Sequence, residues 1–86
     1  MDVIFHKNFK RNYKKLQPSE RKKCDERITL FMKEPHHPVL DNHLLGGKYK
    51  GYRSINITGD LRAIYELVAD NISLFIIVDT HSNLYS

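Results

Sequence analysis

The fold of this chain follows from residues 61–80, LRAIYELVADNISLFIIVDT, which read as two β-strands joined by a tight turn. Residues 61–68 have the period of a strand, with alternate side chains on opposite faces. The pair Asp70-Asn71 is typical of a tight hairpin turn. Residues 72–80 are the most apolar of the expected strands, so we expect this strand to lie at the centre of a sheet.

Further strand and loop segments precede this hairpin. Residues 49–57 alternate and are rich in β-forming residues, which predicts a third strand. Thr58-Gly59-Asp60 then forms a turn into the hairpin. Residues 34–47 contain two prolines and a Gly-Gly pair, so we expect a loop there. Residues 2–5 read as a short opening strand.

Two amphipathic helices lie between the opening strand and the loop. Residues 7–16 have helical spacing, and residues 20–33 are expected to form a second helix capped by Ser19. Each helix needs a sheet or a partner to cover its apolar face. The apolar stripes consist of Phe9, Tyr13 and Leu16 in the first helix, and of Cys24, Ile28, Phe31 and Met32 in the second.

The expected order of elements is β-α-α-β-β-β. It predicts an α+β fold in which the N-terminal strand and two helices pack on one face of an antiparallel sheet. The other face of the sheet is then left to form a concave surface. The 86 residues, 41% of them hydrophobic, are enough for one domain, residues 1–86, with a thin core.

Cysteine usage and hydropathy limit the class of protein. The single cysteine, Cys24, excludes an internal disulfide and a cysteine-rich zinc site, and its place on a helical stripe predicts a core side chain. The longest apolar run, residues 74–78, is far shorter than the roughly 20 residues that span a bilayer. Residues 1–6 lack the basic start and long apolar stretch of a secretion signal, so we expect no such signal. We therefore expect a cytosolic protein that does not enter a membrane.

Positive charge is concentrated in the first third of the chain. Residues 1–27 hold nine Lys or Arg against four acids, an excess of five, whereas residues 28–86 hold five against six. A basic face of this kind attracts nucleic acid or an acidic protein segment. A solvated helix surface is the simpler alternative.

The C-terminal half resembles the RelE/ParE toxin superfamily, and within it the YafQ-type branch of bacterial mRNA interferases. Three segments in order carry the resemblance: HLLGGKYKGYR at 43–53, GDLRAIY at 59–65 and THSNLY at 80–85. The resemblance implies a RelE-like fold and a toxin of a type II toxin–antitoxin module. It implies a ribonuclease that cleaves mRNA in the ribosomal A site of the bacterial cytoplasm, without metal or other cofactor. It also implies a cognate antitoxin, which we expect to be acidic and partly disordered when free.

The resemblance assigns catalysis to His43, Asp60, His81 and Tyr85. Cleavage without metal needs a base for the 2′-OH and an acid for the leaving 5′-oxygen, and histidine suits either role. The resemblance gives Asp60 a catalytic or orienting part, and places Tyr85 against a base or the reacting phosphate. Taken alone, the histidines fit solvated loop or strand-end residues, Asp60 a turn-former and Tyr85 a cap.

Cations for phosphate contact are Arg53 and Arg62 on strands, with Lys48 and Lys50 nearby. Arg62 lies on the face opposite Leu61, so it can clamp a phosphate if that face is the concave one. A surface salt bridge is the alternative for both arginines. The helical lysines that we expect to contact the ribosome or the antitoxin are Lys14, Lys15, Lys22 and Lys23.

Some residues depart from the family pattern or leave alternatives open. Ser54 replaces a carboxylate and Asn56 replaces a histidine, so activity could be weakened or altered. A toxin that only binds its antitoxin, and a ParE-like binder of DNA gyrase, are therefore alternatives. A gyrase binder has no need of the four catalytic candidates, which favours the nuclease. The spacing of His36, His37 and His43 matches no strong metal motif.

Overall fold

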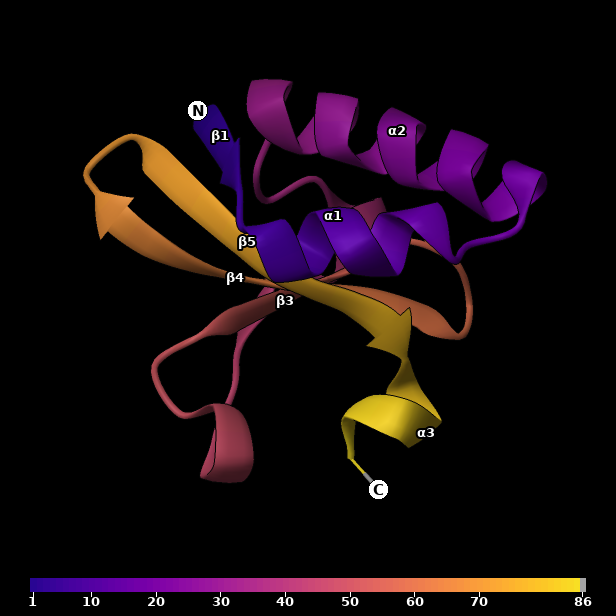
Figure 1. The fold of residues 1–86 in the computed structure, drawn as a ribbon. Helices are drawn as coiled ribbons and strands as arrows, with labels where there is room; N and C mark the ends of the chain where they lie inside the picture. The colour runs from indigo at the N-terminus through magenta and orange to yellow at the C-terminus, as the bar shows by residue number, and fades with distance from the viewer. Residues whose placement is uncertain (86) are drawn as a thin grey trace.

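The computed structural model describes residues 1–85, which form a five-stranded sheet and three helices (Figure 1). The order of strands across the sheet is β1-β5-β4-β3-β2. The strands are β1 (Asp2–Phe5), β2 (His43–Leu44), β3 (Arg53–Asn56), β4 (Leu61–Ala69) and β5 (Ile72–Thr80).

The predicted antiparallel meander is present, with β3 paired to β4 and β4 to β5. The first strand differs from a purely antiparallel sheet, because β1 pairs with β5 in parallel. The expectation that residues 72–80 lie at the centre is wrong by one strand. β5 is flanked by β1 and β4, but β2 extends the sheet beyond β3, so the middle strand is β4.

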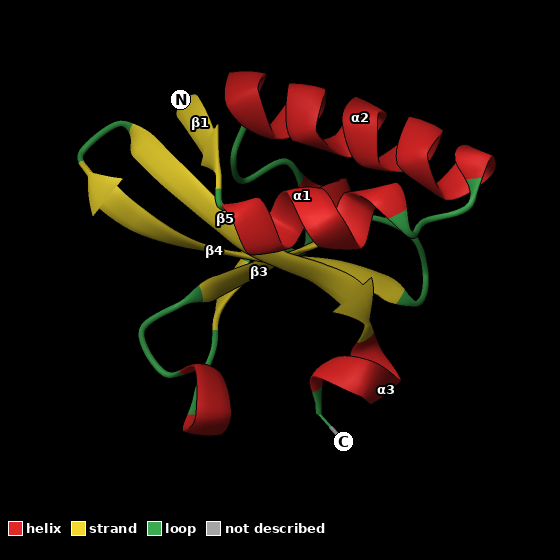
Figure 2. Cartoon of the chain, in the orientation of Figure 1, coloured by secondary structure: helices red, strands yellow, loops and turns green. Residues whose placement is uncertain are grey.

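Helices α1 (Lys7–Lys14) and α2 (Pro18–Lys33) cover one face of the sheet, as predicted (Figure 2). Ser19 does not cap α2, because Pro18 already occupies the first helical position, where its missing N–H costs no hydrogen bond. Gln17 precedes the helix, and its backbone N–H donates to the Glu20 carboxylate at 2.8 Å. Within residues 1–85, no helix has the length and apolar character needed to cross a membrane.

The main core lies between these helices and the sheet and is dominated by aromatic rings. Phe31 of α2 packs edge-on against Tyr65 and Phe75, with ring centroids 4.9 and 5.1 Å apart. Phe9 of α1 packs against Phe75 at 5.9 Å. Cys24 is buried in this core, which confirms its predicted place.

The opposite face of the sheet, here called the open face, carries a second and smaller core. Its buried members are Leu45, Ile64 and Leu84, and Tyr49 and Tyr52 pack against them. The expected bare concave surface is therefore partly covered. Figure 1 shows the two covering parts on the side away from α1 and α2: the segment between β2 and β3, and α3 (His81–Leu84).

The segment around residue 50 accounts for two differences from the sequence prediction. The predicted strand 49–57 is shorter, because Gly47–Tyr49 form a 3₁₀ turn and Gly51 has a φ of 93° that interrupts an extended strand. The predicted loop 34–47 includes the short strand β2, formed only because β3 offers it a partner.

A bulge in β5 lets one strand serve both cores. Ile64 is paired with Ile77, but the next residue, Tyr65, is paired with Phe75, so Ile76 is an extra residue on β5. Phe75 faces the helical core, whereas Ile76 and Ile77 pack against the second core. An alternating pattern alone does not indicate this change of face.

Candidate functional site

The strand register places two predicted site residues on the open face, because side chains paired across a sheet share a face. His43 is paired with Ser54, and Ser54 with Ile64. Asn56 is paired with Arg62 two residues further along. Ile64 belongs to the second core, so His43 and Arg62 also lie on the open face.

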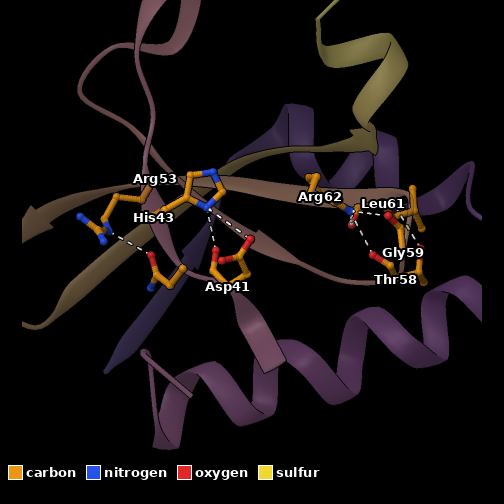
Figure 3. A network of polar contacts seen from close by, with 8 residues as sticks. Asp41, His43, Arg53, Thr58, Gly59, Leu61 and Arg62 are labelled. Carbon is orange, nitrogen blue, oxygen red and sulfur yellow. Dashed lines mark hydrogen bonds and ion pairs between the residues drawn. The ribbon is translucent and has the colours of Figure 1, made fainter. Parts of the chain in front are cut away.

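The exposed ring of His43 is oriented by Asp41 (Figure 3). Its Nδ1 lies 2.7 Å from the Asp41 carbonyl oxygen and 3.9 Å from the Asp41 carboxylate. A carbonyl oxygen can only accept a hydrogen bond, so Nδ1 carries the proton in the neutral ring. The other nitrogen, Nε2, then has a lone pair and can remove a proton from a bound molecule.

Asp60 and His81 meet at one corner of the sheet, although 21 positions separate them in the sequence. Leu61 is paired with Thr80, so the residues just beyond this pair are neighbours. The backbone N–H of His81 donates to the carbonyl oxygen of Asp60 at 2.9 Å. Both residues are exposed, so this backbone bond places an acidic and an imidazole residue next to each other at the corner.

Tyr85 stacks beside His81 at the end of α3. Their ring centroids are 4.9 Å apart, and the Tyr85 ring is also edge-on to Tyr49 at 5.7 Å. The Lys48 ammonium donates to the carbonyl oxygen of Leu84 at 3.3 Å and lies 5.4 Å from the centre of the Tyr49 ring. The 3₁₀ turn and α3 therefore hold each other, and this contact keeps His81 and Tyr85 side by side.

His43 lies apart from this group. It belongs to β2, at the far edge of the sheet, whereas His81 follows β5. Three strand spacings separate β2 from β5, which is about 14 Å at the usual spacing in sheets. The structure thus brings Asp60, His81 and Tyr85 together, and places His43 across the open face from them.

Arg62 shapes the turn that presents Asp60. Its Nη1 donates to the carbonyl oxygens of Thr58 at 3.0 Å, Gly59 at 3.0 Å and Leu61 at 3.2 Å (Figure 3). Its Nε and Nη2 make no hydrogen bond within residues 1–85, so they remain able to contact a phosphate.

Arg53 lies on the other face of the sheet. It is paired with Tyr65, whose ring is in the helical core. The Arg53 Nε donates to Asn42 Oδ1 at 2.9 Å, and Asn42 Nδ2 donates to the Tyr65 hydroxyl at 2.8 Å. Arg53 is thus tied into the loop before β2, away from Arg62.

The remaining predicted cations are spread over the molecule. Lys50 is exposed just after the 3₁₀ turn, on the side of α3 and the open face. The four helical lysines lie in the other layer: Lys14 and Lys15 at the end of α1, Lys22 and Lys23 on α2. Lys23 makes an exposed ion pair with Glu26 at 3.7 Å, which contributes little to stability.

The two residues that depart from the family pattern occupy the centre of the open face. Ser54 is 3% exposed and lies between His43 and Ile64 in the same row. Asn56 lies beside Arg62, and its Oδ1 is buried without a hydrogen-bond partner in the described part of the chain. Neither side chain can exchange a proton at neutral pH, so proton transfer depends on the surrounding residues.

The loop histidines do not form a metal cluster. His37 Nδ1 accepts a hydrogen bond from the Val39 N–H at 3.1 Å, which gives this side chain a structural role. Across residues 1–85, no three His, Cys, Asp or Glu side chains converge as metal ligands.

Sequence reasoning missed Asp41 and Asn42, which orient His43 and Arg53 respectively. Asp41 has a φ of 45°, a left-handed conformation that Asp and Asn adopt more readily than most residues. The Asp-Asn pair directly before His43 could therefore have indicated a turn. Its hydrogen bonds, however, depend on partners elsewhere in the structure.

The sequence and fold of this chain are similar to those of known proteins. The family model described as the bacterial toxin YafQ of type II toxin–antitoxin systems matches residues 1–86. No curated protein matches the chain.

Solved structures with the same fold include several toxins. YafQ from E. coli strain BL21(DE3) is 26% identical to this chain. The match covers 99% of this chain and 98% of the E. coli protein, and its TM-score is 0.81. The E. coli DinJ–YafQ toxin–antitoxin complex matches at 27% identity, 99% and 97% coverage, and a TM-score of 0.79. The RelBE2 complex from Mycobacterium tuberculosis, at 23% identity, 93% and 96% coverage and a TM-score of 0.76, shares the fold.

Proposed function

This chain belongs to the YafQ family of bacterial toxins of type II toxin–antitoxin systems, and we propose that it is an endoribonuclease that cleaves mRNA in the ribosomal A site. Cleavage there stops translation. The observation that carries the proposal is the corner where Asp60, His81 and Tyr85 meet beside the turn held by Arg62.

The chemistry is an acid–base transesterification. A base takes the proton of the 2′-OH, the 2′-oxygen attacks phosphorus, and an acid protonates the departing 5′-oxygen. The products are a 2′,3′-cyclic phosphate and a 5′-hydroxyl. We assign one proton transfer to His81, and the complementary one to Asp60 or Tyr85, the other ionisable side chains at this corner.

The cationic part of the site stabilises the charge that develops on the phosphate. Arg62 has two guanidinium nitrogens available for this task and lies on the open face of the sheet. Lys48, whose ammonium lies against α3, supplies a second positive charge near Tyr85. Across the open face, His43 contacts a neighbouring nucleotide through Nε2. Arg53 acts on the site indirectly, because its hydrogen bond to Asn42 holds the loop just before His43.

The partners follow from the family. The solved DinJ–YafQ and RelBE2 structures are complexes of toxins with antitoxins, which supports a cognate antitoxin for this chain. We expect an acidic antitoxin segment on the basic helical layer. The ribosome supplies the positioned substrate, so few catalytic groups are needed from the toxin itself.

A toxin that only binds its antitoxin is the second candidate. Ser54 and Asn56 favour it, because they remove two ionisable side chains from the centre of the open face. The two candidates differ in whether expression of the chain produces new mRNA ends.

The deciding experiment is primer extension on translated mRNA after expression of wild type, His81→Ala and His36→Ala. His36 is an exposed loop histidine outside the candidate site, so His36→Ala is the matched control. We expect cleavage ends with wild type and His36→Ala, and a loss of at least about 100-fold with His81→Ala, the size of a lost general acid or base.

Two other outcomes contradict the assignment. Ends that persist with His81→Ala would move the proton transfers to His43, Asp60 and Tyr85. Growth arrest by wild type without any new ends would reject the nuclease and favour a binding toxin such as a gyrase poison.

A further inference from the structure

A cavity of about 340 Å³ with a mixed polar and apolar lining lies at one end of the sheet, between α2 and the turn that joins β3 to β4. Lys23 and Arg27, one helical turn apart on α2, form one wall. Residues 56–59 and Val39 form the other, so Ile57 and Val39 add an apolar part to the lining. The cavity is distinct from the apolar space between α1 and α2, which core residues line.

The charge of this cavity is positive. Lys23 and Arg27 are its only charged lining residues. The ion pair of Lys23 with Glu26 is long, at 3.7 Å, and exposed, so an anion in the cavity can replace it. Arg27 makes no ion pair within the described residues. Two cations without a lining carboxylate suit an anionic group.

The opposite wall offers polar groups to the same ligand. The Thr58 Oγ1 accepts the N–H groups of Asp60 at 3.3 Å and Leu61 at 3.0 Å, so its own hydrogen can be donated elsewhere. Open space surrounds Gly59, where a side chain would otherwise stand, so a ligand can approach the backbone.

The turn between β3 and β4 connects this cavity to the candidate active site. The carbonyl groups of Thr58 and Gly59 are held by Arg62 of the open-face site, and Asp60 follows directly. A strand of RNA that crosses this turn can therefore place one phosphate in the cavity while a neighbouring phosphate lies near His81.

We propose that this cavity binds a phosphodiester of single-stranded RNA, with Arg27 and Lys23 as its main contacts, an inference that rests on the proposed function for its choice of RNA. An acidic protein segment is the competing ligand. RNA is favoured because the two cations face the hydroxyl and backbone groups of the β3–β4 turn and the cavity adjoins Asp60.

The test is equilibrium binding of a short, fluorescein-labelled 2′-O-methyl RNA, measured by anisotropy over a series of salt concentrations. The probe has no 2′-OH, so it is bound but cannot be cleaved. The variants are Arg27→Gln and Lys23→Gln, and the control is Lys33→Gln, an exposed residue of α2 outside the cavity. Circular dichroism checks that each variant is folded.

We expect Arg27→Gln and Lys23→Gln each to weaken binding about fivefold or more, and to lower the slope of log K against log salt by about one. Lys33→Gln should weaken binding less than twofold. In NMR spectra, the probe should shift the backbone amides of Thr58 and Gly59 in wild type but not in Arg27→Gln.

Equal effects of Arg27→Gln and Lys33→Gln would overturn the proposal, whether or not mRNA cleavage is observed. A polyglutamate peptide that shifts the same amides when the RNA does not would also overturn it and assign the cavity to an acidic protein. If primer extension shows no cleavage but RNA binding depends on Arg27, the cavity is retained and the nuclease assignment fails.

Discussion

The thiol of Cys24 is a single residue whose chemistry is set by its surroundings. It is 1% exposed in the helical core, and burial raises its pKa from 9.0 to about 12. Desolvation disfavours the thiolate, and the thiolate is the reactive form. A sequence shows that this cysteine is alone, but its reactivity depends on the packing around it.

We therefore expect Cys24 to resist an aromatic disulfide reagent at pH 8 in the folded protein, and to react rapidly in denaturant. The contribution of this thiol to stability should be complete below pH 9 and decline as the pH rises from 9 toward 12, because only the unfolded state then loses the proton. Urea denaturation of wild type and Cys24→Ala across this range measures the decline. Fast labelling of the native protein would contradict the burial.

Arginine placement is the clearest difference between residue-level expectation and structure. Arg53 and Arg62 are both strand residues of the same charge. From the sequence we expect each to contact either a phosphate or an acidic side chain. In the structure, Arg62 donates to three carbonyl oxygens of a turn and Arg53 donates to Asn42. The side-chain role thus depends on which acceptors the fold brings within reach.

Among the elements, α3 shows how a very short helix is stabilised by contacts rather than by its own sequence. Four residues are too few for an isolated helix. Thr80 caps it, accepting the Asn83 N–H at 3.1 Å, and Leu84 is buried in the second core. The helix forms because Leu84 and the Tyr49–Tyr85 contact attach it to the open face.

Leu84→Ala should release α3 without unfolding the domain, because the helical core does not include this residue. We expect a stability loss of about 2–3 kcal/mol, at the low end for buried leucines, since a helix at the chain end can relax. Cleavage should fall at least tenfold, because His81 and Tyr85 lose their support. Urea denaturation and primer extension measure the two effects.

Ser82→Ala is the control, since Ser82 is exposed on the same helix. It should change stability by less than about 0.5 kcal/mol. Full activity in Leu84→Ala, together with unchanged NMR contacts between Tyr49 and Tyr85, would show that α3 is held by other means.

Over the whole molecule, the two faces of the sheet carry different kinds of residues. The helical layer carries Lys14, Lys15, Lys22 and Lys23, whereas the candidate catalytic residues lie on or beside the open face. The basic excess in residues 1–27 therefore lies in the helical layer, whose Lys23 and Arg27 also border the turn that precedes Asp60. An acidic partner can bind there by charge.

Reversing the charge of these four lysines to Glu should weaken binding of the co-encoded antitoxin about tenfold or more at low salt, mainly through slower association. High salt should reduce the difference, because it screens exposed charges. Surface plasmon resonance at several salt concentrations checks both effects. Substitution of the same lysines by Arg is the control, and unchanged affinity after charge reversal would place the antitoxin elsewhere.

Much of the fold could be predicted from local pattern. The periods of residues 7–16 and 72–80 depend only on neighbouring residues, so both elements, and the α+β layering, were predictable. The start of α2 at Pro18 follows a local rule, since proline favours the first position of a helix, so this boundary was also predictable. The strand β2 and the bulge at Ile76 depend on a partner strand, which a local pattern does not contain.

Periodicity, charge and motif spacing are properties of neighbouring residues, so the amino-acid sequence is enough to give the segments, the basic first third and the residue types of the candidate site. Which of those residues lie close together depends on the folded arrangement. Strand register joins Asp60 to His81 and separates Arg53 from Arg62, and the packing of α2 on the sheet brings Arg27 opposite Thr58. Each of these relations is set by hydrogen bonding and packing between segments far apart in the chain, and so it exists only once the sheet has formed.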